Sequence, residues 1–136
     1  MVGTVEWLKV APSSRSSCEH SFVTAQPSPR IRFRRAIDAG SVRLAELTAR
    51  EMHHLTLEEA LELVILYAAD GDPKFERAAC RWLGRLMLER ERLTLSQAQL
   101  AAVALRALED APATAAATLR AVAHSATASP PSPRKR

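Results

Sequence analysis

Apolar residues recur at steps of three and four through the middle of the chain, which is the spacing of one face of an amphipathic helix. Leu57, Leu61 and Val64 follow this spacing, and no segment alternates strongly enough to be a strand. The expected helices cover residues 29–39, 41–53, 57–69, 73–90, 95–108 and 113–124. The last segment is mostly alanine and has only Leu119 and Val122 to bury, so the pattern predicts five to six helices.

The residues between these segments are typical helix starts and stops. Ser28 can cap a helix that has Pro29 in its first turn. Thr56–Glu59 and Thr94–Gln97 have the form of capping boxes, in which the threonine hydroxyl and the side chain three residues later each bond the other's backbone N–H. Gly71 permits the positive φ that ends a helix. The connections are therefore short, and neighbouring helices should pack antiparallel.

We expect an all-α fold, either an antiparallel helical bundle or a short stack of helical hairpins. The segment 63–69 is apolar all round, so several neighbours should enclose it. The expected core contains Leu61, Val64, Leu66, Trp82, Leu83, Leu86 and Leu105.

The chain shows an internal similarity at a shift of 38 residues. Segment 41–69 lies over 79–107 with seven identical residues among 29. A period of this length is typical of helical-hairpin repeats such as tetratricopeptide or HEAT units. The alternative is that two unrelated helices begin with the same favourable cap, and the sequence leaves both interpretations open.

Charge divides the chain into three parts. Residues 1–28 are rich in Ser, show no sustained period and read as a flexible arm, and residues 125–136 read as a disordered, basic, proline-rich tail. The helical domain is expected over 29–124. The net charge of +4 comes from a short entry segment at 30–39 and from the tail, each +3, whereas residues 40–124 sum to −2.

Composition excludes several classes of protein. The chain has 136 residues, 47% of them hydrophobic, which is enough for one small domain and too many for a fully disordered chain. The longest apolar run, 63–69, is too short to span a membrane. No secretory signal is visible, and two cysteines do not make a disulfide scaffold. We expect a soluble cytoplasmic protein.

One basic stripe is the best candidate for a binding site. Lys74, Arg77, Arg81 and Arg85 recur at steps of three, four and four on the fourth helix. The stripe has three possible roles: it could follow the phosphates of a nucleic acid, form a solvated face, or pair with the acidic cluster Glu58, Glu59 and Glu62 on the preceding helix.

Other reactive groups have simpler interpretations. His53 and His54 are adjacent, so they point about 100° apart on a helix and are poorly placed to share a metal ion. The three glutamates favour the start of a helix, where the helix dipole stabilises anions. A single cysteine such as Cys80 usually packs against apolar neighbours and has no reactive role. No catalytic motif, phosphate-binding glycine loop or metal-ligand spacing is present, so we expect no enzyme activity, no cofactor and no metal.

Three strings carry a resemblance to a known group of proteins: Leu-Thr-Leu-Glu-Glu-Ala-Leu at 55–61, Phe-Glu-Arg-Ala-Ala-Cys-Arg-Trp-Leu at 75–83 and Leu-Ser-Gln-Ala at 95–98. Over about two thirds of its length, the chain resembles small uncharacterised helical proteins of high-GC Gram-positive bacteria. The resemblance implies no activity, cofactor or partner.

Two functions follow from these features as hypotheses. The first is a non-catalytic helical module that binds an unidentified protein or a second copy of itself. The second is a small nucleic-acid-associated protein that uses the basic stripe Lys74, Arg77, Arg81 and Arg85 together with its basic flanks.

Overall fold

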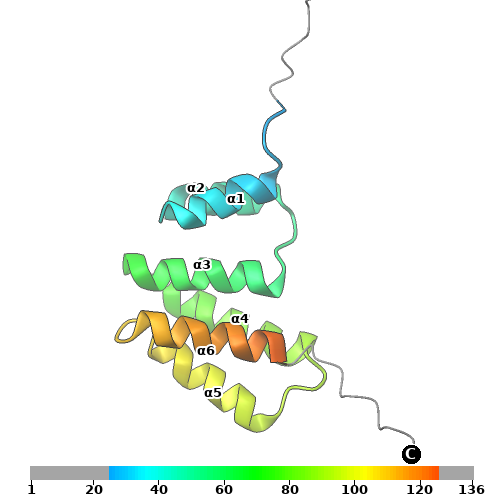
Figure 1. Ribbon diagram of the computed structural model, residues 1–136, viewed down its shortest axis with the longest axis vertical. Coiled ribbons are helices and arrows are strands. Elements are labelled where there is room, and N and C mark those ends of the chain that lie inside the picture. The colour runs from blue at the N-terminus through cyan, green and yellow to red at the C-terminus, as the bar shows by residue number, and fades with distance from the viewer. Residues whose placement is uncertain (1–24, 126–136) are drawn as a thin grey trace, which may run out of the picture.

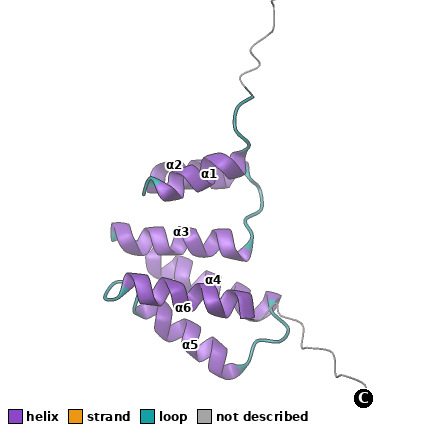
Figure 2. Ribbon diagram, viewed as in Figure 1, coloured by secondary structure: helices purple, strands orange, loops and turns teal. Residues whose placement is uncertain are grey.

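In the computed structural model, which describes residues 25–125, the chain forms six helices and, over those residues, no strand (Figures 1 and 2). The helices are α1 (Pro29–Asp38), α2 (Val42–Glu51), α3 (Leu57–Asp70), α4 (Phe75–Glu89), α5 (Leu95–Arg106) and α6 (Pro112–Ser125). The predicted all-α fold is confirmed. The arm expected over 1–28 and the tail expected over 125–136 lie outside the described residues, except for 25–28 and for Ser125, which ends α6.

Both predicted capping boxes are present. The Thr56 hydroxyl accepts a hydrogen bond from the Glu59 backbone N–H at 3.1 Å, while the Glu59 carboxylate accepts one from the Thr56 N–H at 2.8 Å. Thr94 and Gln97 repeat this arrangement at the start of α5. Gly71 ends α3 with a φ of 65°. That the shared caps reflect a true 38-residue repeat stays a prediction.

Three helix ends differ from the prediction by two residues, one of them that of α5, which ends at Arg106 rather than at residue 108. α2 ends at Glu51, two residues early, because the chain turns at His53, whose φ is 56°. α4 begins at Phe75 rather than at residue 73, because the Asp72 carboxylate accepts the Lys74 N–H and holds these residues in a turn.

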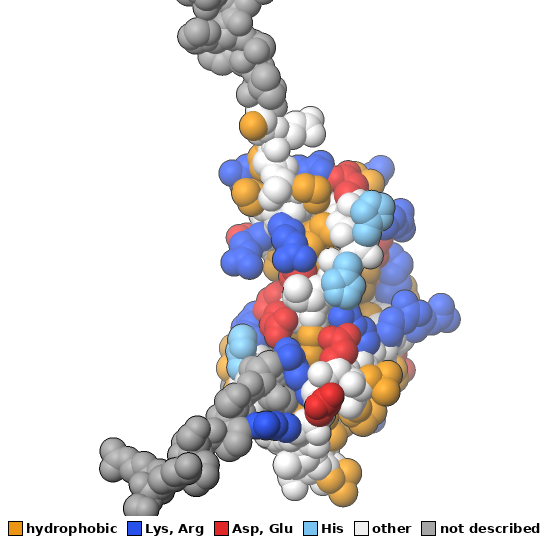
Figure 3. All heavy atoms as spheres, turned by 90° about the vertical axis from the view of Figure 1, so that its right-hand side faces the viewer, with side chains coloured by type: hydrophobic (Ala, Val, Ile, Leu, Met, Phe, Trp, Pro, Cys, Tyr) orange, Lys and Arg blue, Asp and Glu red, His pale blue; other side chains and the backbone are white. Residues whose placement is uncertain are grey.

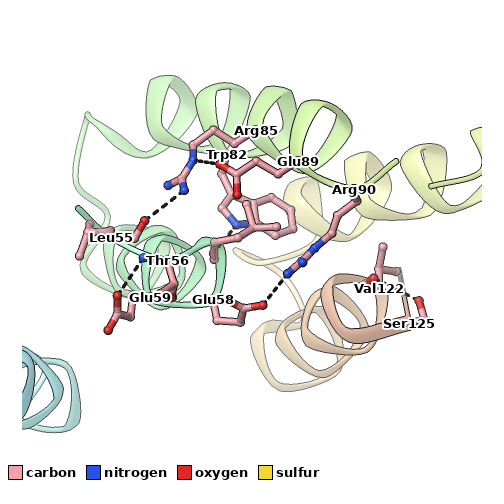
Figure 4. A network of polar contacts seen from close by, with 11 residues as sticks. Leu55, Thr56, Glu58, Glu59, Trp82, Arg85, Glu89, Arg90, Val122 and Ser125 are labelled. Carbon is pink, nitrogen blue, oxygen red and sulfur yellow. Dashed lines mark hydrogen bonds and ion pairs between the residues drawn. The ribbon is translucent and has the colours of Figure 1, made fainter. Parts of the chain in front are cut away.

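Helices α3, α4, α5 and α6 form a four-helix bundle, in which each helix packs against the next and α6 closes back on α3. Trp82 of α4 is 1% exposed at the centre of this bundle, and its ring Nε1–H donates to the Leu57 carbonyl of α3 at 2.9 Å (Figure 4). The largest fully buried side chains are Trp82, Leu61, Leu86, Leu108 and Leu119. Each comes from the apolar face of its helix or from the turn that follows it.

Helices α1 and α2 form a hairpin that packs on the outer side of α3 around a second, smaller core. The buried members of this core are Phe33, Ala36, Ala45 and Leu66. α3 contributes Leu66 to this core and Val64 to the bundle core, so it lies between the two. This arrangement encloses segment 63–68 between neighbours, as predicted, whereas Ala69 at its end is exposed. It explains why α3 is apolar on more than one face.

Six of the seven expected core residues are buried. Leu83 is half-buried instead, because its side of α4 faces a groove between α4 and α5 that no other described helix fills.

Candidate interaction surfaces

The predicted basic stripe lies on one side of α4, but only part of it is free. The Lys74 ammonium lies 2.6 Å from the Glu46 carboxylate of α2. The Arg85 guanidinium pairs with Glu89 at 2.7 Å and also donates to the Leu55 carbonyl at 3.0 Å (Figure 4). Arg77 and Arg81 are exposed and make no ion pair within residues 25–125. The stripe therefore presents two free cations instead of four.

The expected pairing of this stripe with the acidic cluster of α3 is wrong. Each glutamate of the cluster binds an arginine from a different element: Arg30 of α1 lies 3.6 Å from Glu59, Arg90 after α4 lies 2.6 Å from Glu58, and Arg120 of α6 lies 2.7 Å from Glu62. The physical reason is that α4 contacts α3 through its Trp82 face, which turns the basic side toward α2. These three ion pairs therefore link α3 to α1, to the turn after α4 and to α6.

A second polar cluster joins the α1/α2 hairpin to the bundle. The Glu46 carboxylate of α2 accepts hydrogen bonds from the Tyr67 hydroxyl of α3 at 2.8 Å and from Lys74 at 2.6 Å. The bond from Lys74 and then that from Tyr67 lower the pKa of Glu46 below its ordinary value, although burial opposes them. Burial, followed by the bond to Glu46, raises the pKa of Tyr67.

This cluster predicts a pH dependence of stability. Because the pKa of Glu46 is lower in the folded chain than in the unfolded chain, its contribution is complete above the ordinary value of 4.5 and disappears as the pH falls through the lower, folded value. Glu46→Gln should flatten the loss of unfolding free energy below pH 4.5, as measured by urea denaturation at a series of pH values. Glu91→Gln, at an exposed position without an ion pair in the described chain, is the control. Equal acid sensitivity of Glu46→Gln and the native chain would contradict this role.

The remaining candidate groups form no reactive site in the part of the chain described. His53 and His54 are exposed in the turn after α2, and no group of three potential metal ligands occurs among residues 25–125. Cys80 is exposed rather than packed, which corrects the sequence-based expectation. It lies on the side of α4 that borders the α4/α5 groove.

The outer face of α5 is the most unusual surface of the described chain. Leu95 and Val103 are 76% and 64% exposed, and Leu100 is nearly half exposed. Met87 and Leu88, near the end of the preceding helix α4, are also exposed. We call Leu95, Leu100 and Val103 the α5 ridge. Figure 3 shows hydrophobic side chains at the lower end of the molecule, where α5 lies in Figure 1.

Charge is scarce in residues 93–125, although the four residues just before them, 89–92, are all charged. Residues 93–125 contain four Asp, Glu, Lys or Arg residues, whereas residues 25–92 contain 23. One of the four, Arg120, is turned toward Glu62 of α3. A shortage of charge together with exposed aliphatic side chains is typical of the core of a protein–protein interface.

A groove of about 370 Å³ runs beside the α5 ridge, between α4 and α5. Its floor is apolar and includes Phe75, Leu83 and Leu105. Three charged residues, Glu76, Arg106 and Glu109, also line it; all three are exposed and make no ion pair within the described residues. A larger groove of about 890 Å³ lies between α1 and the start of α3, but the glutamates that line it are already paired with arginines.

The opposite end of the molecule also exposes leucines. The sequence pattern places Leu44, Ala45, Leu47, Thr48 and Met52 on the apolar side of α2. Ala45 and Thr48 are buried as expected, but Leu44 and Leu47 are 53% and 51% exposed. The reason is that α2 packs through its smaller residues Ala45 and Thr48, which lie on the neighbouring side of the helix.

Sequence periodicity identified the inner face of α5 but did not single out the α5 ridge. A signal of the ridge was nevertheless present in the sequence, because α5 carries a single charged residue, Arg106, whereas the outer face of an ordinary surface helix has several.

Comparison with known proteins adds no relative: no family model, no curated protein and no solved structure matches this chain. Among the described residues, no helix has both the length and the apolar character needed to cross a membrane.

Proposed function

We propose that this chain is a non-catalytic helical module that binds protein through the α5 ridge and the adjoining α4/α5 groove. The observation that carries the proposal is the exposure of Leu95, Leu100 and Val103 on α5, a helix that contains a single charged residue, Arg106. A helix that faces only water normally places polar residues at such positions.

The energetics favour a protein partner. Removing a leucine or valine side chain completely from water contributes about 1.5–3 kcal/mol, so covering the ridge supplies a substantial part of a binding free energy. The groove beside it has an apolar floor and a charged rim, which suits the apolar face of a partner helix. The α4 stripe supports nucleic-acid binding less well, because Lys74 and Arg85 are held by Glu46 and Glu89.

The test compares two double variants at exposed positions. Leu95→Asp/Val103→Asp places charge on the α5 ridge, and Arg77→Asp/Arg81→Asp removes the two free cations of α4. Each purified protein is used to capture binding proteins and, separately, is passed over immobilised DNA as salt is raised. We expect the ridge variant to lose a specific bound protein and the arginine variant to keep it.

The reverse pattern would overturn the proposal. If the arginine variant lost its partner or its salt-dependent retention on DNA while the ridge variant behaved as the native chain, the basic stripe would be the functional surface. Failure of the native chain to bind any protein, including itself, would also overturn it.

A further inference from the structure

We infer that one partner of the α5 ridge is a second copy of this chain, which docks the outer face of its α2 there in a head-to-tail arrangement. This inference rests on the proposed function of the ridge and names the chemistry of its partner.

The two surfaces lie at opposite ends of the molecule. The α1/α2 hairpin and α5 occupy the two ends of the long axis in Figure 1. Stacked helical hairpins need a polar outer face at each end to stay separate in solution. Here both ends expose aliphatic side chains instead, Leu44 and Leu47 on α2 and the α5 ridge at the other end.

The two ends are also matched in length and pattern. Leu44 and Leu47 lie three residues apart, so they project from the same side of α2 and form a short apolar knob. α2 has 10 residues and α5 has 12, which correspond to about 15 and 18 Å of helix. One helix can therefore lie along the other.

Charge favours contact between unlike ends. The hairpin, residues 29–51, has six basic and three acidic residues and a net charge of +3, whereas residues 93–125 at the α5 end have two basic and two acidic residues and a net charge of zero. Arg43 and Arg50 flank the α2 leucines and make no ion pair in the described chain. They match Glu76 and Glu109, the carboxylates without ion pairs at the rim of the α4/α5 groove. Contact between two hairpin ends would instead bring two charges of +3 together.

The proposed contact predicts how many copies of the chain can associate. The contact is heterologous, so a dimer still has one free α2 face and one free α5 ridge. Self-association should therefore extend beyond the dimer as concentration rises.

The experiment blocks each end separately. Leu44→Asp/Leu47→Asp disables the α2 face, and Leu95→Asp/Val103→Asp disables the α5 ridge, all at exposed positions. Circular dichroism and urea denaturation verify that both variants fold. Sedimentation velocity then follows each full-length protein from dilute solution to its highest soluble concentration.

We expect the native chain to associate with rising concentration and each blocked variant to remain a monomer. An equimolar mixture of the two variants should form a one-to-one heterodimer that does not grow, because each partner retains the end that the other has lost. Arg77→Asp/Arg81→Asp, away from both ends, should associate as the native chain does.

Three results would overturn the inference. The native chain could be monomeric throughout, the mixture could fail to form a heterodimer, or the α2 variant could still dimerise while the α5 variant does not, which would indicate a symmetric contact between two α5 ridges. The proposed function would survive the first result if the ridge still bound a different protein, so the two failures are distinguishable.

Discussion

Replacing Trp82 by alanine is expected to remove most of the stability of this protein. The side chain is 1% exposed where α3, α4 and the rest of the bundle meet, and truncating a buried tryptophan costs about 3–5 kcal/mol. The lost hydrogen bond from Nε1–H to the Leu57 carbonyl adds about 1 kcal/mol. Small domains are stable by only about 5–15 kcal/mol, so urea denaturation followed by circular dichroism should show a transition at much lower urea.

Trp82→Phe separates the two contributions. It retains a large aromatic ring and removes the hydrogen-bond donor, so its cost should be clearly smaller than that of Trp82→Ala. A cost for Trp82→Ala within the about 0.5 kcal/mol typical of surface substitutions would contradict the position of this residue at the centre of the bundle.

Replacing Phe33 by alanine is expected to release the α1/α2 hairpin while the bundle stays folded. The hairpin core contains only four buried residues, and Phe33 is the largest side chain among them. Its truncation costs about 3–5 kcal/mol, which is a large share of what so small a core supplies. Amide hydrogen exchange should show that residues 29–51 lose protection, whereas the bundle helices α4, α5 and α6 keep theirs.

The matched control is Leu119→Ala, which truncates a fully buried side chain of the bundle core. It should weaken protection in α3 to α6 and leave no selective effect on the hairpin. If Phe33→Ala instead lowered protection uniformly over residues 25–125, the two cores would unfold as one unit and their separation would be wrong.

The features that sequence reasoning predicted well are local. Thr56–Glu59 and Thr94–Gln97 form their capping boxes because these bonds need only residues three positions apart. The apolar residues of segment 63–69 predicted an enclosed helix, because a helix can bury two faces only by lying between neighbours.

The features that sequence reasoning missed depend on how each helix is rotated about its own axis relative to its neighbours. Periodicity places Leu44 and Leu47 on the same apolar side of α2 as Ala45 and Thr48. It does not show that the helix packs through the two smaller residues and leaves the leucines exposed. Likewise, one of the three roles left open for the basic stripe was pairing with Glu58, Glu59 and Glu62, whereas the arginines that pair with these glutamates come from α1, from α6 and from the turn after α4. Arg120 is 58 residues from Glu62, a distance at which a single sequence carries no pairing signal.

The most direct test of the central claim is site-specific photo-cross-linking from the α5 ridge. A photoreactive amino acid replaces Val103 in one protein and Arg77 in another, both at exposed positions on helices. After irradiation in cells that produce the chain, position 103 should yield covalent adducts with a polypeptide, either a second copy or another protein, and position 77 should yield few. Adducts from position 77 alone, or only solvent-quenched probe at position 103, would contradict the assignment of α5 as the binding face.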